Sequence, residues 1–170
     1  GAGVGGHCIP KDPWLLASSV RDLNVPVRLI PTAREINSKM PNHIFNLLEQ
    51  QIGEMHNKHI LVLGYAYLAD SDDSRNSPSE DLVKLLETSG VKVSIHDPYI
   101  SKYNGEVYEK ARECDAAVLM TAHSEYEQID LYKLKSVMKK SLIIDGRNLL
   151  NKENAKEAGL DLIRLGDRSN

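Results

Sequence analysis

Cysteine and long apolar runs are scarce in this sequence. Its two cysteines, Cys8 and Cys114, lie far apart in unlike settings, which argues against a disulfide framework and for a reducing, cytoplasmic location. The longest apolar runs, residues 60–63 and 116–120, are much shorter than the roughly 20 residues that cross a bilayer. No signal-peptide pattern is visible. We therefore expect no membrane partner.

A strong excess of one charge is also lacking. The net charge is −3 and no run of basic residues occurs, so we expect no nucleic-acid partner. Apolar residues make up 41% of the chain and charged residues 26%, the balance of an ordinary globular protein. A chain of 170 residues is long enough for one core with an appendage.

Residues 1–8, the cysteine loop, carry four glycines ahead of Cys8. A helix is predicted directly afterwards, with Asp12 as its N-cap and Pro13 at its first position. The positive end of a helix and the nearby Lys11 favour the thiolate, so the pattern predicts a nucleophilic cysteine. An inert, buried thiol is the alternative.

The glycines also fit a second pattern. Gly1, Gly3 and Gly6 match the G-x-G-x-x-G spacing of a dinucleotide-binding turn. That turn needs a strand before it and a helix directly after it. No strand precedes Gly1, and Pro10 and Pro13 follow, so this interpretation is disfavoured.

The spacing of apolar residues predicts two regions with different secondary structure. Residues 13–22 and 32–55 have helical periodicity, with a kink or split expected at Pro41. From residue 58, strands at 60–63, 91–95, 116–120, 142–144 and 162–165 alternate with helices at 79–88, 108–113, 129–137 and 153–158. This predicts an α/β fold, a helical N-terminal segment followed by a doubly wound, mainly parallel Rossmann-like sheet. We place the domain boundary near residue 55, which gives segments 1–55 and 56–170.

Ligands of such sheets bind beyond the carboxyl ends of the strands. The loops expected there are residues 64–76, 96–99, 121–126 and 145–148. Only Gly64 remains of a glycine-rich turn after the first strand, so a dinucleotide site on this sheet is not expected. A nucleotide-sugar diphosphate fits better.

Four ordered motifs resemble the UDP-glucose/GDP-mannose dehydrogenase family, above all its UDP-N-acetylmannosamine dehydrogenase branch. They are G-V-G-G-H-C-I-P-K-D-P at residues 3–13, L-I-P-T-A-R-E-I-N at 29–37, Gly64-Tyr65-Ala66-Tyr67 with Asp70, Asp73, Arg75, Ser77 and Pro78, and D-G-R-N at 145–148. One departure stands out, because the lysine of the family's G-x-A-x-K element falls at Leu68. Family members carry an NAD-binding domain ahead of these motifs, so we expect this chain to be a C-terminal portion.

The resemblance implies oxidation of the C6 alcohol of a UDP-sugar to a carboxylate with two NAD⁺. Cys8 would attack the intermediate aldehyde and give a thiohemiacetal, then a thioester that water hydrolyses. Asp12 would help to activate that water, although a plain helix-end role is the alternative. NAD would be bound mainly by the upstream domain.

The resemblance also assigns binding roles. Gly5, Gly6, Tyr67 and Arg147 would contact the substrate, with Arg147 gripping its diphosphate. Lys11 and Arg75 would face the cofactor, although a solvated lysine and a surface salt bridge are their ordinary alternatives. No metal is implied.

One other class of function stays open, a catalytically silent nucleotide-sugar-binding or oligomerisation module, and we expect the chain alone to be inactive. A receiver-like signalling domain is disfavoured because Gly64 stands where an acidic pocket would be needed. The apolar stripe of residues 32–55 predicts a homodimer, although a core helix would show the same stripe.

Overall fold

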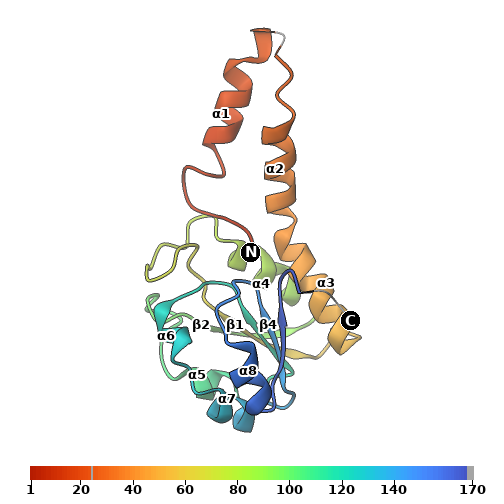
Figure 1. The fold of residues 1–170 in the computed structure, drawn as a ribbon, viewed down its shortest axis with the longest axis vertical. Helices are drawn as coiled ribbons and strands as arrows, with labels where there is room; N and C mark the ends of the chain where they lie inside the picture. Colours follow the sequence, from red (N-terminus) through yellow and green to blue (C-terminus); the bar gives the residue numbers. More distant parts are fainter. Residues whose placement is uncertain (24, 168–170) are drawn as a thin grey trace.

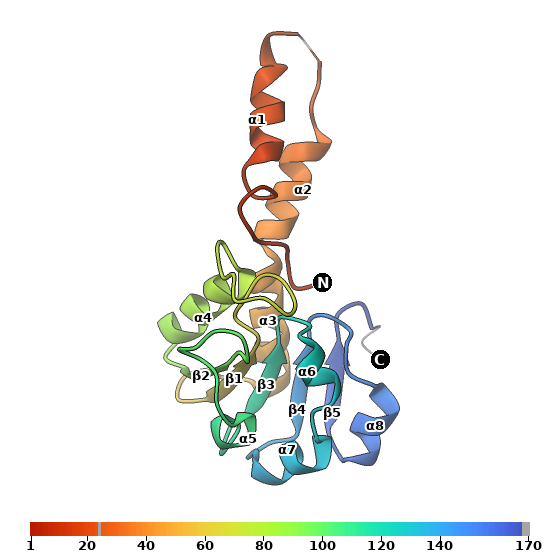
Figure 2. The ribbon, with the colours of Figure 1, turned by 90° about the vertical axis from the view of Figure 1, so that its left-hand side faces the viewer.

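The computed structural model describes residues 1–23 and 25–167. A helical arm near the start of the chain, which carries α1 and α2, rises from an α/β part, and the N-terminus lies where the two meet (Figures 1 and 2). No helix among the described residues is long and apolar enough to cross a membrane.

The sheet has five strands, β1 (His59–Leu63), β2 (Lys92–His96), β3 (Ala116–Leu119), β4 (Leu142–Asp145) and β5 (Asp161–Arg164). Every pairing is parallel, and the strand order is β2-β1-β3-β4-β5. The predicted parallel α/β fold is therefore confirmed. Strands β1, β3 and β4 are almost completely buried, as expected for the centre of a sheet that helices cover on both faces.

Two cores lie on opposite faces of this sheet. Helices α3 (Met40–Ile52) and α4 (Pro78–Thr88) cover one face, where Ile44, Leu48, Leu82 and Leu86 meet the strands. The other face is covered by α5 (Val107–Lys110), α6 (Ser124–Glu127), α7 (Leu131–Val137) and α8 (Lys152–Glu157). Helix α6 was not expected, since its single turn is too short for a periodic signal.

The arm is formed by α1 (Asp12–Ser19), a 3₁₀ turn (Arg21–Leu23) and α2 (Leu29–Ser38), which pack against each other. The predicted cap of α1 is wrong by one residue. Lys11 occupies the N-cap position and makes no side-chain capping bond, while Asp12 is the first helical residue. Because Pro13 has no N–H to donate, it is tolerated anywhere in the first turn.

Helix α2 starts three residues earlier than predicted. Pro31 lies just before the predicted start at residue 32, but in the structure it is in the first turn of α2, where its missing N–H is needed by no partner. The expected split at Pro41 is confirmed, because α2 ends at Ser38 and α3 starts at Met40. The predicted apolar stripe divides with it. Ile44 and Leu48 are fully buried in the core, whereas Ile36 is 59% exposed.

The strand order reverses between β1 and β3. The loops that follow these strands diverge to opposite sides, which is where open α/β sheets bind ligands. The cysteine loop lies against this same edge.

Candidate active site

The cysteine loop is fixed to the carboxyl edge of the sheet by its first residues. Ala2 is fully buried, and its N–H donates to the Gly146 carbonyl at 2.9 Å. A Cβ on Gly146 would lie 2.8 Å from the Cβ of Ala2, so glycine allows this close approach. The start of the chain therefore packs against the D-G-R-N turn after β4.

Arg147 stabilises this contact between the start of the chain and the D-G-R-N turn. Its Nε donates to the Met120 carbonyl at 2.6 Å, and its Nη2 donates to the Gly3 carbonyl at 2.9 Å. Burial lowers the pKa of this guanidinium below its ordinary value. Because two donors of its fork are committed to backbone carbonyls, the geometry favours an anchoring role over a two-point grip on a diphosphate.

Gly5 and Gly6 pack against the loop that follows β1. The Gly6 N–H donates to the Arg75 carbonyl at 2.9 Å, and Asn76 Nδ2 donates to the Gly6 carbonyl at 3.0 Å. A Cβ on Gly5 would overlap the backbone oxygen of Asn76. A Cβ on Gly6, whose φ is +91°, would lie 2.7 Å from the Tyr67 ring. The loop thus needs glycine at both positions for steric reasons.

Cys8 follows this packed segment and is exposed. Its carbonyl accepts hydrogen bonds from the N–H groups of Lys11 and Asp12, at 3.0 and 2.8 Å, so the thiol stands at the entry to α1. Lys11 Nζ lies 3.5 Å from Asp12 Oδ1, and both side chains are more than half exposed. An exposed pair of this kind contributes little stability and leaves both groups free for a ligand.

Arg75 pairs with Asp73. Its Nε and Nη2 reach both carboxylate oxygens of Asp73, with a closest distance of 2.6 Å. The side-chain hydrogen bond from Arg75 lowers the pKa of Asp73 to about 2. The surface salt bridge that was the ordinary alternative for Arg75 is therefore present, and it occupies the Nε and Nη2 edge of the guanidinium.

A buried network that the sequence did not single out holds the loop 64–76. Asp97, at the end of β2, is fully buried, and its Oδ2 accepts hydrogen bonds from the N–H groups of Tyr65 and Ala66 at 2.7 and 2.8 Å. His123 Nε2 lies 3.1 Å from the same oxygen. His123 Nδ1 accepts from the Asp70 N–H at 2.9 Å, which places the proton of the neutral ring on Nε2.

Burial alone would raise the pKa of Asp97. The hydrogen bonds from His123 and from the amides of Ala66, Tyr65 and Tyr99 outweigh it, so the pKa lies well below its ordinary value. An aspartate directly after a predicted strand was the available signal, but a sequence does not show that its partners are the amides of another loop.

Asp145 accepts backbone N–H groups in the turn after β4, as Asp97 does for the loop after β1. Its two carboxylate oxygens accept four backbone N–H groups, those of Arg147, Asn148, Leu149 and Leu150, all at 2.8 Å. The aspartate of the D-G-R-N motif therefore shapes the turn itself.

The sheet offers a poor cradle for a dinucleotide. In a dinucleotide-binding turn, backbone amides after the first strand bind the pyrophosphate. Here the amides of Tyr65 and Ala66 already bind the carboxylate of Asp97. A Cβ on Gly64 would overlap Thr121, so the turn is closed against the neighbouring strand. The described residues thus do not fit NAD at this sheet.

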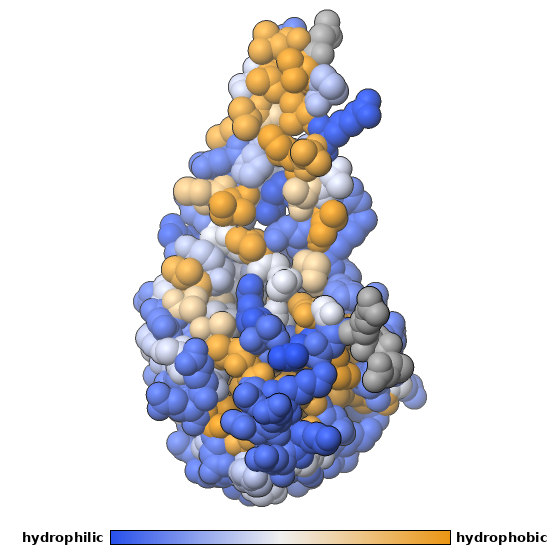
Figure 3. All heavy atoms as spheres, viewed as in Figure 1, coloured by the Kyte–Doolittle hydropathy of each residue, from blue (hydrophilic) through white to orange (hydrophobic). Residues whose placement is uncertain are grey.

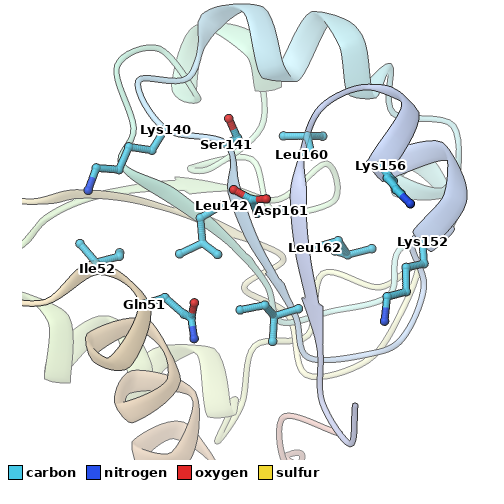
Figure 4. A pocket seen from close by; sticks show the side chains of 11 residues that line it. Gln51, Ile52, Lys140, Ser141, Leu142, Lys152, Lys156, Leu160, Asp161 and Leu162 are labelled. Atoms are coloured by element: carbon cyan, nitrogen blue, oxygen red, sulfur yellow. The ribbon is translucent and has the colours of Figure 1, made fainter. Parts of the chain in front are cut away.

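Two hollows flank the α/β part. One, of about 370 Å³, lies behind the cysteine loop between α2, α3 and the start of α4, and Val4, Arg34 and Asn37 line it. The other, of about 500 Å³, lies at the opposite edge of the sheet, where Lys140 and Lys156 surround the starts of β4 and β5 (Figure 4). None of the predicted site residues lines either hollow. The described residues hold no group of three or more metal-ligating side chains.

Comparison with known proteins identifies two family regions. Residues 61–152 match the UDP-binding domain of the UDP-glucose/GDP-mannose dehydrogenase family, and residues 1–39 match its central domain. The chain is 36% identical over 154 residues to the UDP-N-acetyl-D-mannosamine dehydrogenase of Pyrococcus horikoshii. That alignment covers 88% of this chain and 36% of the relative. A UDP-glucose 6-dehydrogenase of Bacillus subtilis is 32% identical over 94% of the chain and 37% of its own length.

Solved structures agree with this assignment. The UDP-D-ManNAc dehydrogenase of Pyrococcus horikoshii superposes with a TM-score of 0.86 at 34% identity, over 98% of this chain and 39% of the other. An NDP-N-acetyl-D-galactosaminuronic acid dehydrogenase of Methanosarcina mazei gives 0.87 with the same identity and coverage. The chain therefore spans about two-fifths of the length of these relatives. It belongs to the UDP-glucose/GDP-mannose dehydrogenase family.

Proposed function

We propose that the chain is the C-terminal part of an NAD-dependent nucleotide-sugar 6-dehydrogenase that oxidises a UDP-sugar to its uronic acid. UDP-N-acetylmannosamine is the first candidate substrate, because several relatives carry that name. The observation that carries the proposal is the packing of Gly5 and Gly6 on the loop 64–76, since it joins the thiol of Cys8 to the region that matches a UDP-binding domain.

Cys8 is the proposed nucleophile. Its thiolate would add to the aldehyde carbon of the oxidised sugar, and the thioester that follows would be cleaved by water. Asp12, at the first position of α1, lies one turn from Cys8 and would help to activate that water. Lys11, with its exposed ammonium beside Asp12, would stabilise negative charge on the reacting oxygen or on the cofactor.

The proposed cofactor is NAD, held mainly by a domain of the parent protein outside this chain. Arg75 remains a candidate contact through the edge of its guanidinium that Asp73 leaves open. The Tyr65 and Ala66 amides are not proposed to bind the pyrophosphate of NAD, because they already donate to Asp97.

The UDP moiety would lie along the carboxyl edge, against Gly5, Gly6 and Tyr67. Tyr67 is half-buried under the cysteine loop, so its ring is held in place before a ligand arrives. Arg147 would support this site from beneath. Leu68 is 53% exposed and cannot pair with a phosphate, so the diphosphate would need other donors than the family lysine.

We also propose the division into segments 1–55 and 56–170, the first carrying the cysteine loop and a helical dimerisation segment, the second a Rossmann-like UDP-sugar-binding domain. Exposed large apolar side chains gather on the arm (Figure 3), namely Trp14, Leu15, Leu16, Leu23, Val25, Leu29 and Ile36. Such a surface is typical of a protein interface. With two free cysteines, the cytoplasm is the proposed location.

The second candidate function is a silent nucleotide-sugar-binding or oligomerisation module. For the isolated chain this candidate is favoured, because the amides of Tyr65 and Ala66 are already bound to the carboxylate of Asp97. We therefore expect the isolated chain to bind a UDP-sugar without reducing NAD⁺. Measurable NAD⁺ reduction by the isolated chain would rule this candidate out.

Calorimetric titration with UDP, UDP-N-acetylmannosamine and UDP-glucose tests the proposal. We expect saturable binding that weakens at least tenfold in Tyr67→Ala, while Tyr132→Ala, an exposed tyrosine on α7, leaves it unchanged. Absence of binding for all three ligands would contradict a UDP-sugar site in this chain.

A further inference from the structure

A side-chain amide joins the helical arm to the cysteine loop. The Val4 N–H donates to Asn37 Oδ1 at 2.8 Å, and Asn37 Nδ2 donates to the Val4 carbonyl at 2.9 Å. The two residues are 33 positions apart, and Asn37 lies in the last turn of α2. One carboxamide thus pairs with both polar groups of one residue, as a neighbouring strand would.

Apolar packing contributes little to holding the chain at Val4. The Val4 side chain is 51% exposed, and both of its neighbours are glycines. Hydrogen bonds therefore hold the middle of the cysteine loop. Those to Gly3 and Gly6 come from Arg147 and Asn76 of the α/β part, whereas Asn37 supplies the contact from the arm.

The position of the Cys8 thiol is set by the backbone of the cysteine loop. Cys8 is exposed, and among the described residues no hydrogen bond orients its sulfur. Its location follows from the fixed points at residues 2–6 on one side and from the start of α1 on the other. A loop released at Val4 would keep both ends while its middle moved.

We propose that Asn37 is a positioning residue for Cys8, one that sets the distance between the thiol and a ligand bound on the loop 64–76. This rests on the proposed function, in which Cys8 attacks a group of the bound nucleotide sugar. A displacement of about 1 Å at a reacting atom can reduce a rate about 100-fold, without changing the affinity of the ligand.

A UDP derivative that carries a bromoacetyl group tests the distance. When it is bound, the Cys8 thiolate displaces bromide and forms a carbon–sulfur bond. Iodoacetamide alkylates the same thiol without prior binding and reports its intrinsic reactivity. We expect Asn37→Ala to lower the directed rate at saturation about 100-fold. The iodoacetamide rate and the UDP affinity should stay within about twofold, as expected when only position changes.

Asn42→Ala is the matched control, because Asn42 is an exposed asparagine on the neighbouring helix α3. It should leave both rates unchanged. A directed rate in Asn37→Ala within twofold of the wild-type rate would overturn the proposal. Absence of UDP binding by the wild-type chain would instead overturn the proposed function.

Asn37→Asp supplies a readout that needs no ligand. A protonated carboxyl group offers one donor and one acceptor, as the amide does, whereas a carboxylate offers only acceptors. As the pH rises through the ordinary aspartate pKa of about 3.9, the carboxylate still accepts from the Val4 N–H, but the donor to the Val4 carbonyl is lost and the new charge repels that oxygen. We therefore expect the carbonyl carbon resonance of Val4 in this variant to shift between pH 3 and 6. Wild type and Asn37→Ala should show no such transition. A Val4 carbonyl resonance in Asn37→Asp that does not move with pH would show that Asn37 does not hold the loop.

Discussion

At the scale of single residues, the carboxylate of Asp97 accepts hydrogen bonds from backbone amides after β1, the part of the fold whose amides bind a phosphate in dinucleotide-binding sheets. It is buried, charged and surrounded by N–H donors from the loop after β1 and from the imidazole of His123. An internal anion of this kind shapes the loop and closes it to an external one. The same edge of the sheet is then free to present side chains and the cysteine loop.

Removal of this carboxylate should destabilise the protein strongly. Asp97→Ala leaves four backbone amides and the His123 N–H without their acceptor, and we expect a loss of ~3–5 kcal/mol in the free energy of unfolding. Urea denaturation measures this. Asp161→Ala, at an exposed aspartate that begins β5, serves as the control and should change stability by less than about 0.5 kcal/mol. Equal effects of the two substitutions would contradict a structural role for Asp97.

The pH dependence follows from the depressed pKa of Asp97. A carboxyl group whose pKa is lower in the folded state stabilises the fold fully above its unfolded pKa of about 3.9, and this contribution is lost as pH falls toward the folded pKa. We expect the stability difference between wild type and Asp97→Asn to be constant from pH 7 to 5 and to shrink below pH 4. Urea midpoints at pH 6, 4 and 3 check this, and a difference that grows below pH 4 would show the opposite sign.

The glycines of the cysteine loop predict a second effect at this scale. Gly6→Ala combines a positive φ with a Cβ that meets the Tyr67 ring, whereas Gly53→Ala has a φ of +81° and open space around it. Gly53→Ala should therefore cost only backbone strain, about 1–3 kcal/mol. Gly6→Ala should in addition release the loop, seen as faster proteolysis near residue 6. In the double variant Gly6→Ala/Tyr67→Ala, the rate of proteolysis near residue 6 should be lower than the effects of the two single substitutions together predict. A rate equal to their combined effects would argue against a contact between Gly6 and the Tyr67 ring.

At the scale of elements, the helices 29–52 divide one apolar pattern between two tasks. Ile44 and Leu48 on α3 are fully buried against the sheet, while Ile36 on α2 points to solvent. A helical period shows which residues share a face but not what covers that face, so the sequence could not separate core from interface here. The strands were easier to predict, because short runs of buried aliphatic residues between turns have few other interpretations.

Single substitutions should separate the two tasks. Ile44→Ala removes a fully buried side chain and should cost ~2–5 kcal/mol, whereas Ile36→Ala should cost less than about 0.5 kcal/mol in a monomeric state. Thermal unfolding of both variants at low protein concentration measures this. A large loss in Ile36→Ala under those conditions would mean that α2 has an apolar partner within its own chain.

The candidate site was predictable in part for related reasons. Motif spacing pointed to Cys8 and to the loops 64–76 and 145–148, and the structure brings these segments together at one edge. Motif spacing did not show that Arg147 is paired with Gly3 and Arg75 with Asp73. Side-chain partners far away in sequence, such as Asp97 with Tyr65 or Asn37 with Val4, depend on tertiary packing that spacing does not encode.

At the scale of the whole molecule, the arm exposes apolar surface well away from the sheet (Figures 2 and 3). We expect a homodimer, with a mass by light scattering of twice the 19.0 kDa chain. Leu16→Glu combined with Leu29→Glu should shift the mass toward the monomer, because both side chains are exposed on the arm. Leu68→Glu, at an exposed leucine of the α/β part, should leave it unchanged. A monomeric mass for the wild-type chain would contradict the dimer.

The seating of the cysteine loop has a consequence for the order in which the molecule assembles. Its partners are Asn37, Arg75, Asn76, Gly146 and Arg147, so the most distant contact closes a span of 144 residues. Contacts across such spans form late, because most of the conformational entropy must be lost before they can be made. The cysteine loop can therefore take its described position only once β4 has joined the sheet. In an incomplete or misfolded chain, Cys8 would lie in a segment without these partners.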